Sequence, residues 1–137
     1  MRNLKNVVAG REVISILATQ SVFDAAKLMA AKNVGAVLVM NGPRLDGILT
    51  ERDIITKIVA LGRNPETVLV SEIMTANPVV MAADKPFVRA LVAMSEGKFR
   101  HIPVVEGFKV IGVVSIRDAI GAEHEQMDRM IHALNSI

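Results

Sequence analysis

Residues 47–54, GILTERDI, recur 65 positions later as residues 112–119, GVVSIRDA. The same offset aligns Met29 with Met94 and Gly42 with Gly107, and no gap is needed between these pairs. Self-similarity at a fixed period of this length is the signature of a duplicated supersecondary unit. We therefore expect two copies of one unit: residues 1–65 with an N-terminal segment, and residues 66–137 with a linker and a C-terminal helix.

The two copies have the same predicted order of elements. Apolar residues at helical spacing predict helices over residues 21–33 and 86–97, with Asp84 as the N-cap of the second helix and Gly97 as its end. Two short apolar runs follow each helix and flank a turn that contains Gly, which is typical of a β-hairpin. An extended segment precedes each unit, and a further helix begins at Thr50 or Ser115. Each copy is therefore predicted to be a β-α-β-β-α unit, with strands over residues 13–17, 34–40, 45–49, 78–81, 101–105 and 110–114.

A single unit of this size is too small to stand alone. A sheet of two or three short strands is marginally stable by itself, and so are many domains of about 60 residues. Two units can cover each other. The sequence therefore predicts an α/β (α+β) fold, in which two β-α-β-β-α repeats pack sheet to sheet with pseudo-twofold symmetry. Clefts between the repeats are then the natural places for ligand pockets.

The composition excludes several classes of protein. Of the 137 residues 51% are hydrophobic and none is Cys, which excludes a disordered chain, a disulfide scaffold and a thiolate zinc site. The pI of 9.2 reflects a net charge of only +2, and neither a basic run nor an aromatic platform suits nucleic acid. No apolar stretch approaches the roughly 18 residues that span a bilayer, and no secretion signal is evident. We expect a cytoplasmic protein that binds neither nucleic acid nor membrane.

The repeated motif lies where a predicted strand passes into a predicted helix. One interpretation is structural, because Thr50 with Asp53, and Ser115 with Asp118, have the spacing of a capping box. The other is functional. Asp is a less usual partner in that box than Glu or Gln, and the motif also keeps an Arg that a cap does not require. The motif Gly lets another group approach the backbone closely.

The functional interpretation is a seat for a nucleotide. A helix N-terminus favours phosphate, and hydroxyl and guanidinium groups beside it add hydrogen-bond donors. A carboxylate in the same corner matches the vicinal hydroxyls of a ribose, as in dinucleotide folds. Short apolar side chains suit a slot for the base. The candidate residues are Thr50, Arg52 and Asp53 in one corner, Ser115, Arg117 and Asp118 in the other, and Ala36, Val37, Ile102 and Pro103 for the base.

At these residues the chain resembles a tandem pair of CBS domains, also called a Bateman module. The segments AAKLM (residues 25–29) and ALVAM (90–94) match the family's first helix, and the two motif copies match its strand-to-helix corner. The linker (residues 70–79) and FRHIPVV (99–105) resemble the family's lead-in to a second repeat and its second strand. The resemblance covers residues 13–121, which is nearly the whole chain.

The resemblance implies a regulatory module that binds adenosine-containing ligands, such as AMP, ADP, ATP, NAD or S-adenosylmethionine, between the repeats. It implies that Asp53 and Asp118 hold the ribose diol, and that Thr50 and Ser115 reach ribose or phosphate. It also implies a homodimer, a regulated protein partner that the sequence does not identify, and no required cofactor. We expect no enzymatic activity, because the chain shows no nucleophile motif and no catalytic carboxylate pair.

Basic residues on the second strand often meet phosphate in the family, which here implies Arg100 and His101. The first copy has Gly35 and Ala36 at the equivalent positions, so we expect the two clefts to differ in affinity. We expect the cleft of Asp118 to hold the basic strand. The rival hypothesis is a dimerising assembly module that keeps the fold, uses the motif as helix caps, and leaves the pocket unused.

Two features of the C-terminal segment suggest other roles. His124, Asp128 and His132 are spaced four apart on a predicted helix, but charged neighbours favour an ordinary solvated face over a metal site. An apolar stripe on the same helix suits packing on a partner chain or return packing on the chain's own module. The stripe consists of Met127, Met130, Ile131 and Leu134.

Overall fold

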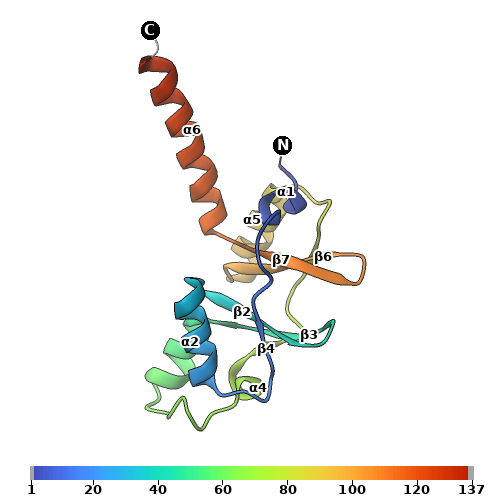
Figure 1. The fold of residues 1–137 in the computed structure, drawn as a ribbon, viewed down its shortest axis with the longest axis vertical. Coiled ribbons are helices and arrows are strands. Elements are labelled where there is room, and N and C mark those ends of the chain that lie inside the picture. The colour runs from blue at the N-terminus through green and yellow to red at the C-terminus, as the bar shows by residue number, and fades with distance from the viewer. Residues whose placement is uncertain (1, 136–137) are drawn as a thin grey trace.

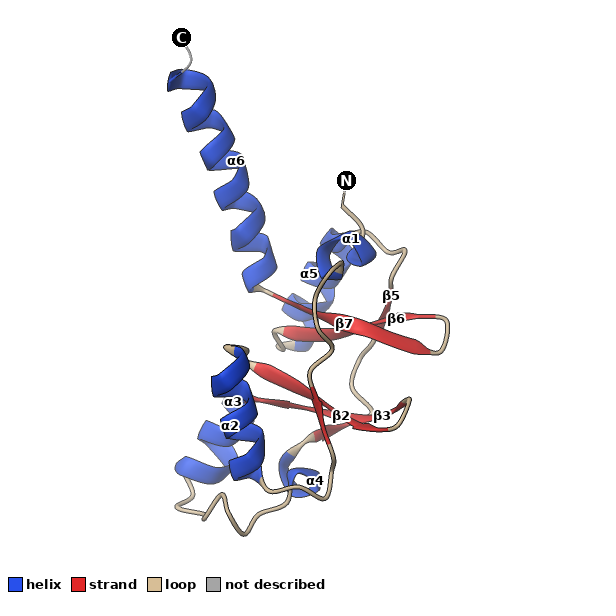
Figure 2. Cartoon of the chain, viewed as in Figure 1, coloured by secondary structure: helices blue, strands red, loops and turns tan. Residues whose placement is uncertain are grey.

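The computed structural model describes the backbone of residues 2–135 and the side chains of residues 2–120 and 129–135. It confirms two successive α/β repeats (Figures 1 and 2). The N-terminal segment and first repeat contain α1 (Leu4–Val8), β1 (Ser15–Ile16), α2 (Val22–Lys32), β2 (Ala36–Asn41), β3 (Arg44–Thr50), α3 (Glu51–Ile54) and the π-helix η1 (Ile55–Val59). The linker and second repeat contain α4 (Val70–Ile73), β4 (Thr75–Ala76), β5 (Met81–Ala82), α5 (Phe87–Gly97), β6 (His101–Glu106), β7 (Lys109–Ser115) and α6 (Arg117–Asn135).

The strands form two small sheets of matching topology. In the order β1-β2-β3-β4, β1 runs parallel to β2, and β2 and β3 form the expected antiparallel hairpin. In the order β5-β6-β7, β5 runs parallel to β6, and β6 and β7 form the second hairpin. Gly42 and Gly107 lie in the two hairpin turns at φ of 59° and 63°, a conformation that favours glycine. The predicted fold class is therefore confirmed.

The two sheets face each other in the middle of the molecule, and helices cover their outer faces (Figure 2). Alternate side chains of a strand point to opposite faces. In β2, Val37 and Val39 accordingly belong to the core under α2 and α4, whereas Ala36 and Leu38 pack in a cluster with Val110 of the other sheet. Because both faces are covered, β2 is a continuous apolar run. This packing leaves the clefts at the ends of the strands.

The lead-in segment of each repeat packs on the other repeat. Leu4, Val7 and Val8 of α1 belong to the core of the second repeat, and α4 belongs to the core of the first. The backbone N–H of Leu4 donates to the carbonyl of Lys85, at 2.9 Å. The segment before residue 10, which the sequence grouped with the first repeat, therefore packs on the second. The division at residue 65 itself stays a prediction.

The motif glycines are the points at which these lead-ins make close contact. A Cβ on Gly112 would lie 2.8 Å from the Cβ of Val8, and one on Gly47 would lie 2.7 Å from the carbonyl oxygen of Thr75. Both distances are too short for real carbon contacts, so each position needs glycine. The expected close approach is confirmed, and the group that approaches is the protein's own chain.

The predicted cap of α5 was wrong. The N-cap is Pro86, which aligns with Ser21, the residue whose Oγ accepts the N–H of Asp24 and so caps α2 at 3.0 Å. Pro86 has extended ψ (147°) and no N–H of its own, so the helix begins after it and Asp84 lies too early. The helix ends at Gly97 as predicted. The left-handed residue after it is Lys98, at φ of 57°.

Helix α6 extends away from the two sheets (Figure 1). The described side chains of its apolar stripe, Met130, Ile131 and Leu134, are exposed, and Met127 lies outside the described side chains. Return packing on the module is therefore not formed by the described part of the stripe. No helix in the described part of the chain is long and apolar enough to cross a membrane. The cytoplasmic location stays a prediction.

Candidate functional site

Two cavities between the repeats contain the motif acids. The cavity beside Asp118, here the Asp118 cleft, has a volume of about 510 Å³, and the cavity beside Asp53, here the Asp53 cleft, about 550 Å³. Both volumes suit a small ligand. The charged and polar residues that line the Asp118 cleft include Arg11, Glu12, Lys32, Glu51, Arg100, His101, Ser115, Arg117 and Asp118. Those of the Asp53 cleft include Thr50, Glu51, Arg52, Asp53, Asn77, Lys98, Arg100 and His101.

The strand-to-helix corner is built in the same way in each repeat. The backbone N–H of the residue after the corner hydroxyl, Glu51 or Ile116, donates to the carbonyl of the residue just before the second strand, Gly35 or Arg100, at 2.9 and 3.0 Å. This bond closes the corner and brings the motif side chains to the mouth of the cleft. The repeat offset therefore relates the two clefts, with residues 32–36 in one and 97–101 in the other.

Asp53 makes the capping box that the structural interpretation predicts. Its Oδ2 accepts the backbone N–H and the hydroxyl of Thr50, both at 3.0 Å, while the Thr50 hydroxyl accepts the N–H of Asp53 at 3.2 Å. The other oxygen, Oδ1, pairs with Lys57 Nζ at 3.1 Å. The side chain is 14% exposed. Asp53 thus caps its own helix and lines a cavity at the same time.

The Asp118 carboxylate hydrogen bonds to the corner of its own repeat and to a cation that is distant in the sequence. Its Oδ2 accepts the backbone N–H of Ser115 at 2.8 Å and Nη1 of Arg11 at 3.2 Å. Its Oδ1 accepts Nη2 of Arg11 at 2.5 Å. The Asp118 side chain is only 10% exposed, whereas that of Arg11 is 42% exposed. Both carboxylate oxygens are therefore occupied by the protein in this structure.

The basic strand residues do not belong to one cleft. Arg100 and His101, expected beside Asp118, line both cavities, and so does Glu51. Burial lowers the pKa of His101 below its ordinary value of 6.5; Arg117 and Arg100 add to this, and Glu51 and Asp118 oppose it. His101 is therefore neutral at pH 7 and can donate or accept one hydrogen bond on each side of its ring.

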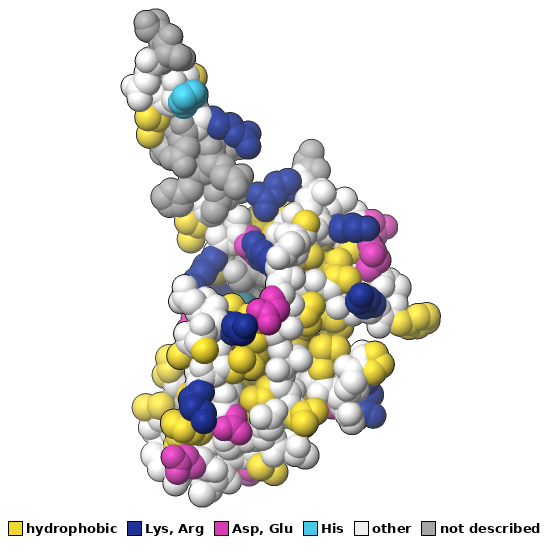
Figure 3. All heavy atoms as spheres, viewed as in Figure 1, with side chains coloured by type: hydrophobic (Ala, Val, Ile, Leu, Met, Phe, Trp, Pro, Cys, Tyr) yellow, Lys and Arg dark blue, Asp and Glu magenta, His cyan; other side chains and the backbone are white. Residues whose placement is uncertain are grey.

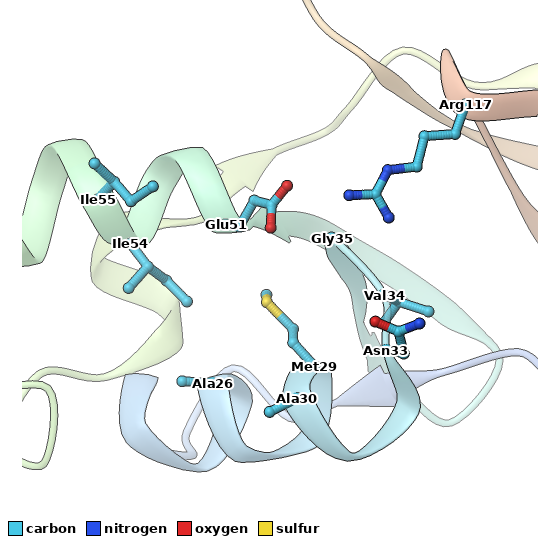
Figure 4. Close-up of a pocket in the computed structure, with 10 residues that line it drawn as sticks. All are labelled: Ala26, Met29, Ala30, Asn33, Val34, Gly35, Glu51, Ile54, Ile55 and Arg117. Atoms are coloured by element: carbon cyan, nitrogen blue, oxygen red, sulfur yellow. The ribbon is translucent and has the colours of Figure 1, made fainter. Parts of the chain in front are cut away.

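A third cavity of about 350 Å³ opens on the helical side of the first repeat (Figure 4). Met29 and Ala26 of α2 line it together with Ile55 of η1. The side chains of Glu51 and Arg117 point toward each other across the space beside Gly35. This cavity therefore connects the motif corner of the second repeat to the helices of the first.

Most of the predicted site residues line the clefts, but the predicted base slot does not. Ala36 lines the Asp118 cleft, whereas Val37, Ile102 and Pro103 are fully buried. The clefts offer other apolar groups instead: Val13, Ile14 and Val113 beside Asp118, and Ile48, Pro78, Val79 and Phe99 beside Asp53. Val13, Ile14, Pro78 and Val79 come from the lead-in segments, Val113 and Ile48 come from the hairpins, and Phe99 lies between α5 and β6.

The sequence pattern missed several cationic residues of the clefts. Arg11 and Lys32 line the Asp118 cleft, and Lys98 lines the Asp53 cleft. Lys32 pairs with Glu12 of the same cavity, at 3.0 Å. Lys32 ends α2 and Lys98 directly follows α5, but the offset of 65 pairs them with Gly97 and Asn33, so the repeat alignment does not relate the two lysines. Cationic side chains gather where the two halves meet, with acidic ones beside them (Figure 3).

The described residues hold no group of three metal-ligating side chains. Of the three tail residues weighed as metal ligands, His132 is exposed, and the side chains of His124 and Asp128 lie outside the described residues.

The family model for the CBS domain matches residues 4–60 and 70–125. The chain therefore belongs to the CBS domain family and holds a tandem pair of these domains. It is 42% identical over 110 residues to the CBS domain-containing protein CBSCBSPB2 of Arabidopsis thaliana, a match that covers 80% of this chain and 20% of that protein. The chain thus spans about a fifth of the length of this relative and of CBSCBSPB3 from the same plant.

Solved structures of similar length have the same fold. A CBS domain protein from Pyrobaculum aerophilum complexed with AMP has a TM-score of 0.78 and 25% identity, covering 85% of this chain and 89% of that one. A CBS domain pair in complex with 5′-methylthioadenosine and S-adenosyl-L-methionine has a TM-score of 0.80 and 25% identity, covering 92% of this chain and 98% of that one.

Proposed function

We propose that this CBS pair is a regulatory module that binds an adenosine-containing ligand in the clefts between its repeats. The observation that carries the proposal is the position of the two repeat-related acids. Asp53 and Asp118 each line a cavity of ligand size, next to a hydroxyl corner and cationic side chains. A helix cap alone needs neither the cavity nor the cations.

The chemistry of each cleft fits the parts of a nucleotide. The carboxylate accepts from the ribose hydroxyls, and the guanidinium groups of Arg100 and Arg117 or Arg52 suit phosphate oxygens. In the Asp118 cleft, Val13, Ile14 and Val113 offer apolar contacts to the base. In the Asp53 cleft, Pro78 and Val79 occupy the repeat-related positions of Val13 and Ile14. AMP, 5′-methylthioadenosine and S-adenosylmethionine, which similar structures contain, share the adenosine that these groups would recognise.

We propose binding without catalysis, and a homodimer that acts on a protein partner. A ligand changes the state of such a module only if it binds two conformations with different affinity. His101, Arg100 and Glu51 lie at both clefts, so a ligand in either one would act on the same side chains. Through these three residues, ligand binding in either cleft could change the position of one sheet relative to the other.

The rival function is a dimerising assembly module with unused clefts. The capping bonds of Asp53 and the ion pair of Asp118 favour it, because both carboxylates already have partners. The exposed apolar residues Ile55 and Ile120, which the repeat offset relates, would supply the dimer surface.

Thermal unfolding with AMP, ADP, ATP, NAD and S-adenosylmethionine separates the two functions. A ligand at a hundred times its dissociation constant should stabilise the fold by about 2.7 kcal/mol. We expect at least one ligand to do so, and we expect Asp118→Ala and Asp53→Ala each to weaken its binding, because each acid lines one cleft. If none of the five ligands stabilises the fold, the assembly module is favoured. If the native protein and both variants bind a ligand with equal affinity, Asp53 and Asp118 do not contact the ligand.

A further inference from the structure

The packing of α1 decides which residue meets Asp118. Because α1 belongs to the core of the second repeat, the chain leaves it beside β7. The turn after α1 passes through Gly10, at φ of 76°, and the backbone N–H of Arg11 donates to the carbonyl of Val8 at 3.0 Å. Arg11 is thereby placed over the corner of the second repeat, 107 residues away in the sequence.

Arg11 pairs with both oxygens of Asp118 at the wall of the cleft. The two Nη atoms take one carboxylate oxygen each, at 2.5 and 3.2 Å, and Nη1 also reaches the carbonyl of Val113 at 3.4 Å. Arg11 itself lines the cleft. A ligand that hydrogen bonds to both oxygens of Asp118 therefore competes with this guanidinium, and an anionic group on the ligand would replace the charge-assisted hydrogen bonds that Arg11 loses.

The Asp53 cleft lacks this arrangement. The position equivalent to Arg11 is Ala76, which has no charge. The cation that does pair with Asp53 is Lys57, which contacts Oδ1 alone and also donates to the carbonyl of Ile73 at 2.9 Å. Lys57 is not among the described residues that line the cleft. A ligand in this cleft therefore need not displace Lys57 to approach the acid.

We propose that Arg11 selects the ligand of the Asp118 cleft: it admits phosphorylated adenosine and rejects the unphosphorylated nucleoside. This inference rests on the proposed function and names the ligand class of one of its clefts. A phosphate offers Arg11 the same two-oxygen geometry as Asp118, so the guanidinium moves from the acid to the ligand and the acid becomes free for the ribose. Adenosine offers no anion and must compete with the ion pair. Arg11 is a specificity residue that acts on both ends of the ligand.

The test compares adenosine with AMP by calorimetry in three proteins, each carrying Asp53→Asn so that binding reports on the Asp118 cleft. Without further change, AMP should bind and adenosine should bind much more weakly. With Arg11→Gln, adenosine should bind roughly fivefold to tenfold more tightly and AMP more weakly, so the ratio of the two affinities falls by about tenfold or more. Arg11→Lys, which keeps the charge but contacts fewer oxygens, should lie between.

Lys32→Ala is the matched control. It removes one positive charge from the same cleft, where Lys32 pairs with Glu12 and not with Asp118. Lys32→Ala should weaken the binding of AMP without raising the affinity for adenosine. An unchanged affinity ratio in Arg11→Gln, or the same gain for adenosine in Lys32→Ala, would overturn the inference alone. Failure of AMP to bind the Asp53→Asn protein, while another of the five ligands stabilises the native chain, would also overturn the inference alone. No binding of any of the five ligands to the native chain would overturn the proposed function and the inference with it.

Discussion

His101 makes stability depend on pH through a single side chain. Burial, with Arg117 and Arg100 nearby, lowers its pKa from the ordinary 6.5, and Glu51 and Asp118 only partly oppose this. Below pH 6.5 the unfolded chain therefore binds a proton that the folded chain does not. The free energy of unfolding should fall as the pH drops through 6.5, and the fall should end once the pH passes the lowered pKa of the folded state.

His101→Gln isolates this effect. Urea unfolding between pH 7.5 and 5 should show a steeper loss of stability in the native protein than in the variant, because all other titrating groups are common to both. Saturating AMP should reduce the difference, since a phosphate near His101 raises its pKa. Superimposable pH profiles of the two proteins would contradict the prediction.

At the level of single residues, the sequence predicted which acids line the clefts but not their partners. Asp53, Asp118, Thr50 and Ser115 follow from the motif, because strand, corner and helix are local. Arg11 does not follow, because its contact with Asp118 depends on where α1 packs. The prediction of the residues that bind the base was wrong for a related reason. Val37 and Ile102 have the right size, but they point to the helix side of their strands.

At the level of elements, the exchange of lead-in helices determines the fold as much as the two sheets do. The duplicated sequence predicted the hairpins, α2 and α5 from their own periodicity, and it predicted the starts of α3 and α6 from the motif at Thr50 and Ser115. Helices α1 and α4 are too short for a periodic signal, and the repeat offset is what relates residues 4–8 to 69–73. In the sequence, Gly47 and Gly112 indicated a close contact with the backbone, but only the structure shows that the lead-in segments make this contact.

Gly112→Ala tests the exchange. The new Cβ would lie 2.8 Å from the Cβ of Val8, with the helix backbone directly behind it, so α1 must shift. We expect a loss of about 1–3 kcal/mol in the free energy of unfolding, as for other overpacked cores. Gly35→Ala is the control, because its Cβ meets only side chains, Oε1 of the flexible Glu51 at 3.0 Å and Nε2 of His101 at 3.4 Å. Equal, small losses in both variants in urea unfolding would show that α1 is not held on β7.

At the level of the whole molecule, the helical sides of the two repeats leave apolar residues exposed at related positions. Ile55 and Ile120 are 58% and 53% exposed, and the offset of 65 relates them. Ile55 also lines the third cavity, which Arg117 reaches from the start of α6. Apolar residues repeated at equivalent places in both halves form a surface that is itself pseudo-twofold. Such a surface suits a twofold dimer, in which each patch faces its own copy.

We therefore expect the native chain to be a dimer and the double variant Ile55→Asp, Ile120→Asp to be a monomer in sedimentation experiments. Burying these isoleucines contributes about 1.5–3 kcal/mol each, so their replacement by charge should raise the dissociation constant of the dimer by roughly a hundredfold or more.

Phe108→Asp is the control: Phe108 lies fully exposed at the tip of the β6–β7 hairpin, outside this surface, and its replacement should leave the dimer intact. A native chain that sediments as a monomer at every concentration would contradict the helical surface as an interface. Loss of the dimer in Phe108→Asp would instead move the interface to the hairpins, where it would lie over the sheet edges rather than over the helices.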